Sequence, residues 1–397
     1  MKPQFVLFDD QIRNDLLPLT YMKPIAALRV GILTIQEKWA HWLGQMPTYL
    51  TEAYLQKKYP LQQAEHSILI HGALCPDPAL VSQILALKSG EALVKGDTVL
   101  AQYISSHEFE EGQDAVLPSA EVREYTADVT ILQYPWDIFT LNAAEIHRDF
   151  AILTAGKTSL PVPPGTTVWG DHPVFIEEGA EIRGAMINTM DGPVYIGTGA
   201  EIMEGSLIRG PFALCNHAQL KMGAKIYGGT TIGPYSRVGG ELNNVVIQGY
   251  SNKAHDGFLG HSVIGEWCNI GADSNCSNLK NTYAEVKMWH YPSWRFINTG
   301  LQFCGLIMGD HSKCGINTMF NTGTVVGVSS NLYGSGFHRN FIPSFSWGGP
   351  QGFHLYDLDK AMQVAESVMR RRGMVFDETE REIFRHLHNH CRMFARK

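Results

Sequence analysis

The chain has 397 residues, enough for two or three domains, and its 44% hydrophobic and 18% charged residues exclude a largely disordered protein. Its 32 Lys and Arg residues against 39 Asp and Glu residues give a net charge of -7, which argues against a nucleic-acid partner. No apolar run reaches the ~20 residues that span a bilayer, and the first residues do not form a secretion signal, so we expect a cytoplasmic protein. The seven cysteines include no close Cys-x-x-Cys pair, so we expect no metal site.

The first part of the chain, residues 1–155, has the alternating strand and helix patterns of a small α/β domain. The expected elements are a strand at 5–8, a helix at 32–43, a strand at 67–70, a helix at 78–87 and a hairpin of 92–94 with 98–103. This alternation is typical of nucleotide-binding layers. A linker rich in Pro, Gly and Thr follows at 156–166.

A repeat of six residues dominates the next domain, residues 167–338. Of the 39 glycines in the chain, 31 lie between residues 165 and 352. A period of six fits neither an α-helix nor a free strand, but it fits a parallel β-helix whose in-phase side chains point inward. The in-phase residues are Ile196, Ile202, Ile208, Leu214, Leu220, Ile226, Ile232 and Val238, then Val246, Asn252, Phe258, Ile264, Ile270 and Cys276, then Met308, Cys314, Phe320, Val326 and Leu332.

Two further segments complete the chain. Residues 279–305 break the six-residue period and are expected to protrude as a loop. The carboxy-terminal segment is 339–397, and its expected helices are 357–372 and 377–394. The alternating histidines of the second helix fan apart around its axis, so we expect no metal cluster there; they are His386, His388 and His390.

The hexapeptides at residues 194–199 and 230–235 resemble those of the hexapeptide acyltransferases. The resemblance implies a left-handed parallel β-helix. That family usually works as a trimer with active sites between neighbouring subunits, so a homotrimer is implied here by resemblance alone.

Residues 251–278 resemble the acetyltransferase half of the bifunctional N-acetylglucosamine-1-phosphate uridyltransferase/glucosamine-1-phosphate acetyltransferases. The resemblance places His255 as the catalytic base, which suits a neutral imidazole near pH 7. Phe258 stands in place of a substrate-binding Tyr, Asn278 in place of an acceptor-binding Asn, and Ala272 where the backbone contacts acetyl-coenzyme A. His261 replaces an Asp of the family motif.

The charged phosphate ligands of that family are missing at their aligned positions, where Asn216 and Asn243 stand. Lys253 and Lys287 are the nearest cations in the sequence that could replace them, so both join Asn243 as expected acceptor ligands. Two later stretches, 306–315 and 322–328, resemble coils that hold acetyl-coenzyme A. They place Asp310 and Val328 on the donor side.

The run at residues 13–31 resembles the signature of the sugar nucleotidyltransferases. Expected nucleotide or sugar ligands are Asp9, Asp10, Arg13 and Lys23. Asp9 and Asp10 occupy the place of a glycine-rich phosphate loop, and Ala73 stands where a magnesium-binding Asp belongs. The domain is therefore expected to be degenerate, with Mg²⁺ required only if it is active.

Four functions are compatible with these patterns. The first is an acetyl-coenzyme A dependent acetyltransferase acting on an aminosugar phosphate or a nucleotide sugar. The second is a bifunctional UDP-N-acetylglucosamine diphosphorylase and glucosamine-1-phosphate N-acetyltransferase. The third is a metal-dependent hydratase with three His across a trimer interface, and the fourth is a non-catalytic trimeric scaffold.

Overall fold

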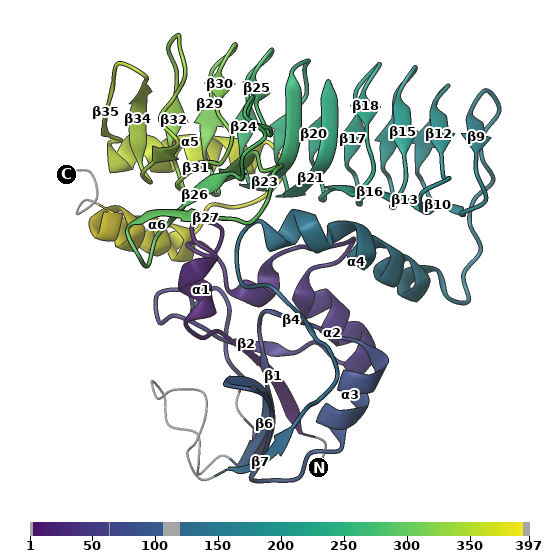
Figure 1. Ribbon diagram of the computed structural model, residues 1–397, viewed down its shortest axis with the longest axis vertical. Helices are drawn as coiled ribbons and strands as arrows, with labels where there is room; N and C mark the ends of the chain where they lie inside the picture. The colour runs from purple at the N-terminus through teal and green to yellow at the C-terminus, as the bar shows by residue number, and fades with distance from the viewer. Residues whose placement is uncertain (1–2, 63, 106–119, 392–397) are drawn as a thin grey trace. The chain divides into compact units, whose positions relative to one another are not determined.

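The computed structural model describes residues 3–62, 64–105 and 120–391. Its contacts divide the chain into two compact units, which we treat separately (Figure 1). Unit 1 holds most of the first 134 residues. Unit 2 runs from Pro135 onward and also includes two short stretches, 17–21 and 29–32. The domain boundaries at residues 155 and 166 remain a prediction.

Unit 1 is built on a six-stranded sheet with the order β2-β1-β3-β6-β5-β7. The strands β1, β2 and β3 are parallel, whereas β3, β6 and β5 are joined antiparallel. Its strands are β1 (Gln4–Phe8), β2 (Thr48–Leu50), β3 (His66–His71), β5 (Glu91–Lys95), β6 (Thr98–Ser105) and β7 (Glu121–Glu124), with the separate pair β4 (Leu74–Cys75) and β8 (Thr130–Ile131). Its helices are α1 (Ile12–Asp15), η1 (Ile25–Ala27), α2 (Ile35–Leu43) and α3 (Pro78–Leu85).

The elements expected in this unit are all present, with boundaries that differ by one to three residues. The helix expected from residue 32 begins at Ile35, because Thr34 accepts a hydrogen bond from the backbone N–H of Glu37 while the Glu37 carboxylate accepts one from Thr34. Such a capping box fixes a helix start.

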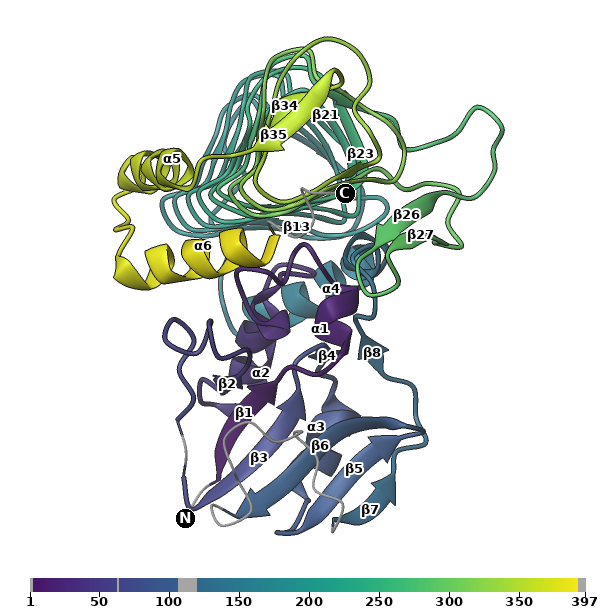
Figure 2. The same ribbon diagram turned by 90° about the vertical axis from the view of Figure 1, so that its left-hand side faces the viewer.

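Unit 2 is a three-sided parallel β-helix, seen end-on in Figure 2, and the predicted fold class is confirmed. Its largest sheet contains β9 (Thr167–Trp169), β10 (Val174–Ile176), β12 (Met186–Asn188), β13 (Val194–Ile196), β15 (Leu207–Arg209), β16 (Phe212–Leu214), β18 (Lys225–Ile226), β19 (Thr230–Ile232), β21 (Glu241–Gly249), β23 (Phe258–Glu266), β28 (Leu306–Met308), β31 (Thr324–Val326) and β33 (Phe341–Ile342). The second long sheet contains β11 (Glu181–Ile182), β14 (Glu201–Ile202), β17 (Gln219–Leu220), β20 (Arg237–Val238), β22 (Asn252–Lys253), β24 (Asn269–Ile270), β29 (Lys313–Cys314), β32 (Asn331–Leu332), β34 (Ser346–Gly349) and β35 (Gly352–Leu355). The remaining pair on the β-helix is β25 (Asn275–Cys276) with β30 (Met319–Phe320).

At three places the residue that points into the β-helix is the one that follows the residue predicted from the six-residue period. The interior residues there are Ile247, Lys253 and Leu259 rather than Val246, Asn252 and Phe258. The cause is that β21 and β23 each continue through a corner as one nine-residue strand. Inward positions on such a strand are five residues apart, which shifts the period on either side.

One corner of the β-helix carries a stack of aromatic rings. The rings of His217, Tyr235, Tyr250, Trp267 and His311 follow one another with centroids 4.3 to 6.1 Å apart. All five residues have left-handed backbone conformations, with φ between 54° and 62°. Bulky residues rarely adopt this conformation, so ring stacking offsets its cost.

The helix α4 (Asp137–Thr154), which no sequence pattern indicated, packs on the face formed by β16, β19 and β21. Its Ile146 and Phe150 are buried with Phe175 and Tyr195. Asn142 is fully buried and donates hydrogen bonds to the carbonyl oxygen of Gly229 and the hydroxyl of Thr231.

The segment 279–305 protrudes as predicted and contains the hairpin β26 (Lys287–His290) and β27 (Arg295–Asn298) (Figure 2). The two carboxy-terminal helices are α5 (Leu358–Arg370) and α6 (Glu378–Cys391). Asp357 caps α5 as a hydrogen-bond acceptor. The expected end of α6 at residue 394 lies outside the described residues.

Candidate active site

His255 lies in the exposed turn between β22 and β23. Its carbonyl oxygen accepts a hydrogen bond of 2.6 Å from Lys253 Nζ. The turn is tightly confined, because a Cβ on Gly257 would stand 2.1 Å from the carbonyl oxygen of Ser274. An exposed imidazole on a well-defined turn can meet a substrate and accept its proton.

Lys253, expected to bind the acceptor, is instead an interior residue of the β-helix. It is 2% exposed and pairs in register with Val238 of the preceding coil. Burial lowers its pKa from 10.5 to about 8, although the nearby carboxylates of Asp256 and Asp273 oppose the shift. The ammonium group bonds to the carbonyl oxygens of His255 and Asp256, and the expected role of Lys253 as an acceptor ligand stays a prediction.

The strand face beside His255 presents one residue per coil in a regular column. Lys225 pairs in register with Glu241, and Glu241 with Phe258. Lys225 is exposed and Phe258 half-buried, so a cation stands two coils from the aromatic ring. Lys225 was not predicted from the sequence, because the number of residues in each coil determines which residues align in this column. That number depends on how β21 passes through its corner.

The other aligned asparagines lie apart. Asn243 is two residues beyond Glu241 on the same strand, β21, and is half-buried. Asn216 is exposed beside the corner of stacked aromatic rings, where its carbonyl oxygen accepts a hydrogen bond from the backbone N–H of Tyr235. The structure thus brings Asn243, but not Asn216, to the face that carries Phe258.

Asn278 and His261 form a side-chain pair on this face. Asn278 Nδ2 lies 2.9 Å from His261 Nδ1. The His261 ring stacks on Phe303 and meets the edge of Phe139. Burial lowers the pKa of His261, so its neutral form is favoured.

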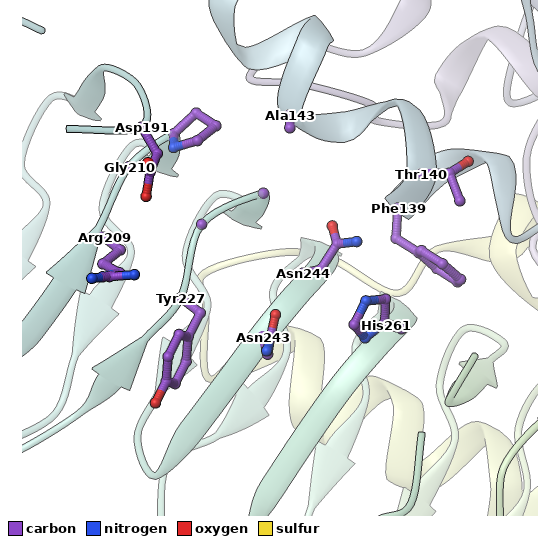
Figure 3. A pocket seen from close by; sticks show the side chains of 13 residues that line it. Phe139, Thr140, Ala143, Asp191, Arg209, Gly210, Tyr227, Asn243, Asn244 and His261 are labelled. Carbon is purple, nitrogen blue, oxygen red and sulfur yellow. The ribbon is translucent and has the colours of Figure 1, made fainter. Parts of the chain in front are cut away.

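A cavity of about 370 Å³ opens beside this pair, between α4 and successive corners of the β-helix (Figure 3). His255 is not among its described lining residues. The cavity combines a guanidinium, carboxamides, a phenol, a carboxylate and an imidazole, which can hydrogen-bond a polyhydroxylated or anionic ligand. Its polar lining residues are Thr140, Asp191, Arg209, Tyr227, Asn243, Asn244 and His261.

The residues expected to hold acetyl-coenzyme A fall at two different corners. Asp310 and Val328 are buried in consecutive coils of one corner, where Asp310 Oδ1 accepts a hydrogen bond from the backbone N–H of Glu266. Ala272 lies at another corner, where its carbonyl oxygen accepts a hydrogen bond from Asn317. Lys287 is exposed at the start of β26.

In unit 1, polar side chains gather where the parallel strands β1 and β3 end. The carboxyl ends of parallel strands are the usual place for ligands in α/β sheets. Asp9 is buried, accepts hydrogen bonds from the backbone N–H of Ile25 and the hydroxyl of Thr51, and forms an ion pair with Arg13. Burial raises its pKa from 3.8 to about 6, against those three lowering interactions.

Asp10 lies 3.1 Å from Nε2 of His71, the last residue of β3. Partial burial raises its pKa, but the interactions with His71 and the backbone N–H groups of Ile12 and Asp10 together outweigh burial, so the pKa is lowered overall. The expected ligand Lys23 is buried, and Ala73 is fully buried without an acidic group.

These side chains do not fit a Mg²⁺ ion as they stand. Asp9 and Asp10 are engaged with Arg13 and His71, and within residues 3–62, 64–105 and 120–391 no three His, Cys, Asp or Glu side chains are grouped as metal ligands. We therefore derive no step through a metal here. No helix of the described chain combines the length and apolar character that crossing a membrane requires.

Comparison with known proteins bears on both units. Residues 5–158 match the family model of sugar nucleotidyl transferases. The bifunctional sugar-1-phosphate nucleotidylyltransferase/acetyltransferase of Sulfurisphaera tokodaii is 32% identical over 93 residues, which are 23% of this chain and 23% of that protein. The chain is thus aligned with under a quarter of its curated relative.

Solved structures of UDP-N-acetylglucosamine acyltransferases are similar to the β-helix. The enzyme of Bacteroides fragilis 9343 matches 60% of this chain and 86% of its own, with 16% identity and a TM-score of 0.30. The Arabidopsis enzyme matches 55% and 79%, with 15% identity and a TM-score of 0.24. The resemblance to sugar nucleotidyltransferases and to bifunctional nucleotidylyltransferase/acetyltransferases expected from the sequence is confirmed.

Proposed function

We propose that the β-helix transfers an acetyl group from acetyl-coenzyme A to the amine of an aminosugar phosphate or a nucleotide sugar, with His255 as general base. The observation that carries this proposal is the exposed imidazole on a confined turn, at the edge of the face that bears Phe258. The amine nitrogen attacks the thioester carbonyl carbon while the His255 imidazole takes the amine proton. The carbon–sulfur bond then breaks, and the leaving thiolate of coenzyme A takes the proton from the His255 imidazolium, which restores the neutral base.

The acceptor lies on the strand face between His255 and the cavity. Lys225 is an exposed cation of this face and pairs with the acceptor's phosphate. Asn278 and Asn243 contribute amide hydrogen bonds, whereas Phe258 contributes only an apolar surface. The cavity beyond Asn243 accommodates the more distant part of the acceptor, where Arg209 supplies a second positive charge.

Acetyl-coenzyme A is bound mainly by backbone groups of Ala272, Asp310 and Val328. The buried positions of Asp310 and Val328 support a backbone role. The exposed Lys287 on the protruding hairpin is available for an anionic group of either substrate.

The active form is a homotrimer. Support comes from exposed apolar side chains on the strand face, where Met186 and Leu207 are neighbours in register and are 46% and 45% exposed. A second copy of the chain would bury this surface. Sedimentation at several protein concentrations tests it, and a species that stays monomeric would contradict it.

Unit 1 binds a nucleotide or sugar and transfers nucleotidyl groups poorly. The engagement of Asp9 and Asp10 within the unit supports this. The bifunctional alternative is favoured by one observation, the similarity to the bifunctional sugar-1-phosphate nucleotidylyltransferase/acetyltransferase of Sulfurisphaera tokodaii. Robust release of pyrophosphate from UTP and a sugar 1-phosphate would establish that alternative.

The direct test offers the purified protein acetyl-coenzyme A with a panel of aminosugar phosphates and nucleotide sugars, and measures free thiol and the mass of the product. Acetylated sugar is expected with at least one acceptor. A non-catalytic scaffold predicts that neither thiol release nor coenzyme A binding is seen, and a hydratase predicts metal-dependent activity without coenzyme A.

A further inference from the structure

Lys253 is an unusual residue for the interior of this β-helix. The inward positions around it hold apolar side chains, among them Val238, Leu259 and Ile264. Burying an ammonium group costs free energy unless hydrogen bonds replace its water. A lysine at this position therefore needs a reason that packing does not supply.

The lysine side chain folds back onto the turn that follows its own strand. Its Nζ donates hydrogen bonds to the carbonyl oxygen of His255 at 2.6 Å and to that of Asp256 at 3.2 Å. The Asp256 oxygen also accepts a hydrogen bond from the backbone N–H of Asp273 in the next coil. One cation thus ties the two residues at the centre of the turn from inside.

The neighbouring coils leave this turn little freedom. A Cβ on Gly240 would stand 2.7 Å from the Gly257 carbonyl oxygen and 2.9 Å from both the His255 oxygen and Lys253 Nζ. The backbone N–H of Phe258 donates a hydrogen bond of 2.8 Å to Asn275 Oδ1. The ammonium is the only described side-chain group that bonds the carbonyl oxygens of His255 and Asp256.

We propose that Lys253 is a positioning residue that holds the backbone of residues 255–256 from within the β-helix and thereby fixes the direction of the His255 imidazole. This inference rests on the proposed role of His255 as the base. It assigns Lys253 no contact with either substrate. Removing the Lys253 ammonium should therefore lower kcat and leave substrate binding unchanged.

The test compares Lys253→Met with Val238→Ala in steady-state acetyl transfer. Lys253→Met keeps the buried stem and removes the ammonium, so we expect kcat to fall 10- to 100-fold with an unchanged KM for acetyl-coenzyme A. Removing the ammonium relieves the cost of burying it but leaves the His255 carbonyl oxygen without this donor, so the Tm of Lys253→Met should change less than that of Val238→Ala. Val238→Ala opens the same interior stack without touching the turn, so its Tm should fall while kcat stays within about twofold.

Lys253→Gln, which restores a hydrogen-bond donor, should recover part of kcat. In the His255→Ala background, Lys253→Met should cause no further loss of residual turnover, because a positioning residue has nothing left to position. An additive loss in the double variant, or full kcat in Lys253→Met, would overturn the inference. If His255→Ala itself keeps full turnover, the proposed function fails instead, and the two failures are distinguishable.

Discussion

Burial of the Asp9 carboxylate predicts that the stability of unit 1 depends on pH. Burial raises its pKa from 3.8 to about 6, so the folded chain holds the proton more tightly than the unfolded chain. A group of this kind destabilises the fold as pH rises from about 4 to about 6, and the loss persists at higher pH. A shift of roughly 2 units corresponds to about 3 kcal/mol, at 1.36 kcal/mol per unit.

The variant Asp9→Asn removes the titration and keeps an oxygen that can accept the hydrogen bond from Ile25. At pH 4 its unit 1 should be about as stable as that of the original chain. At pH 8 it should be more stable by at most about 3 kcal/mol, a figure that already includes the favourable interaction of the Asp9 carboxylate with Arg13.

Hydrogen exchange of the β1 and β3 amides at both pH values measures this difference within unit 1. Asp97→Asn, in the exposed turn between β5 and β6, serves as control and should change nothing. The reasoning is refuted if Asp9→Asn is less stable than the original chain at pH 8, because Asp9 would then be a favourable ion-pair partner of Arg13.

Three further substitutions have expected outcomes. Phe258→Tyr should lower the acceptor KM several-fold and leave the KM for acetyl-coenzyme A unchanged, because it restores a hydrogen-bonding group to the acceptor face; steady-state kinetics with both substrates measure it. Gly257→Ala should lower both Tm and acetyl transfer, since φ is 113° and the added Cβ would stand 2.1 Å from the Ser274 carbonyl oxygen; an active, equally stable variant would contradict the packing. Trp267→Ala should lower the free energy of unfolding by about 3 to 5 kcal/mol in denaturant titration, because its ring is buried in the aromatic stack.

The β-helix was predictable because each short side must bury one residue, and a run of eight apolar residues at intervals of six leaves few alternatives. Its phase was not predictable near β21 and β23. Both strands pass through a corner, and Asn244 and His261 make the turn with positive φ while the strand continues. No local sequence signal distinguishes a continuous corner from an ordinary one.

The helix α4 escaped prediction because part of its buried face is polar. Asn142, Glu145 and Asp149 are buried, and Asn142 and Asp149 accept hydrogen bonds from the backbone N–H groups of Gly31 and Ile32. Polar residues on the inner face erase the apolar period by which amphipathic helices are recognised.

The candidate site was only partly predictable, because its geometry depends on the number of residues in each coil. The motif around His255 identified the turn, but which neighbouring side chains share its face depends on coil length. Lys253 is two residues from His255 in the sequence and lies inside the β-helix, whereas Lys225 is 30 residues away and lies by register on the strand face that carries Phe258.

We propose that His255 removes the acceptor's proton during acetyl transfer. The most direct measurement is the single-turnover rate of acetyl transfer by His255→Ala, compared with His354→Ala, which changes an exposed histidine on β35. We predict a loss of about 10²- to 10⁴-fold for His255→Ala at neutral pH, with acetyl-coenzyme A binding intact, and no loss for His354→Ala. A rate for His255→Ala within a few-fold of the original chain would contradict the account.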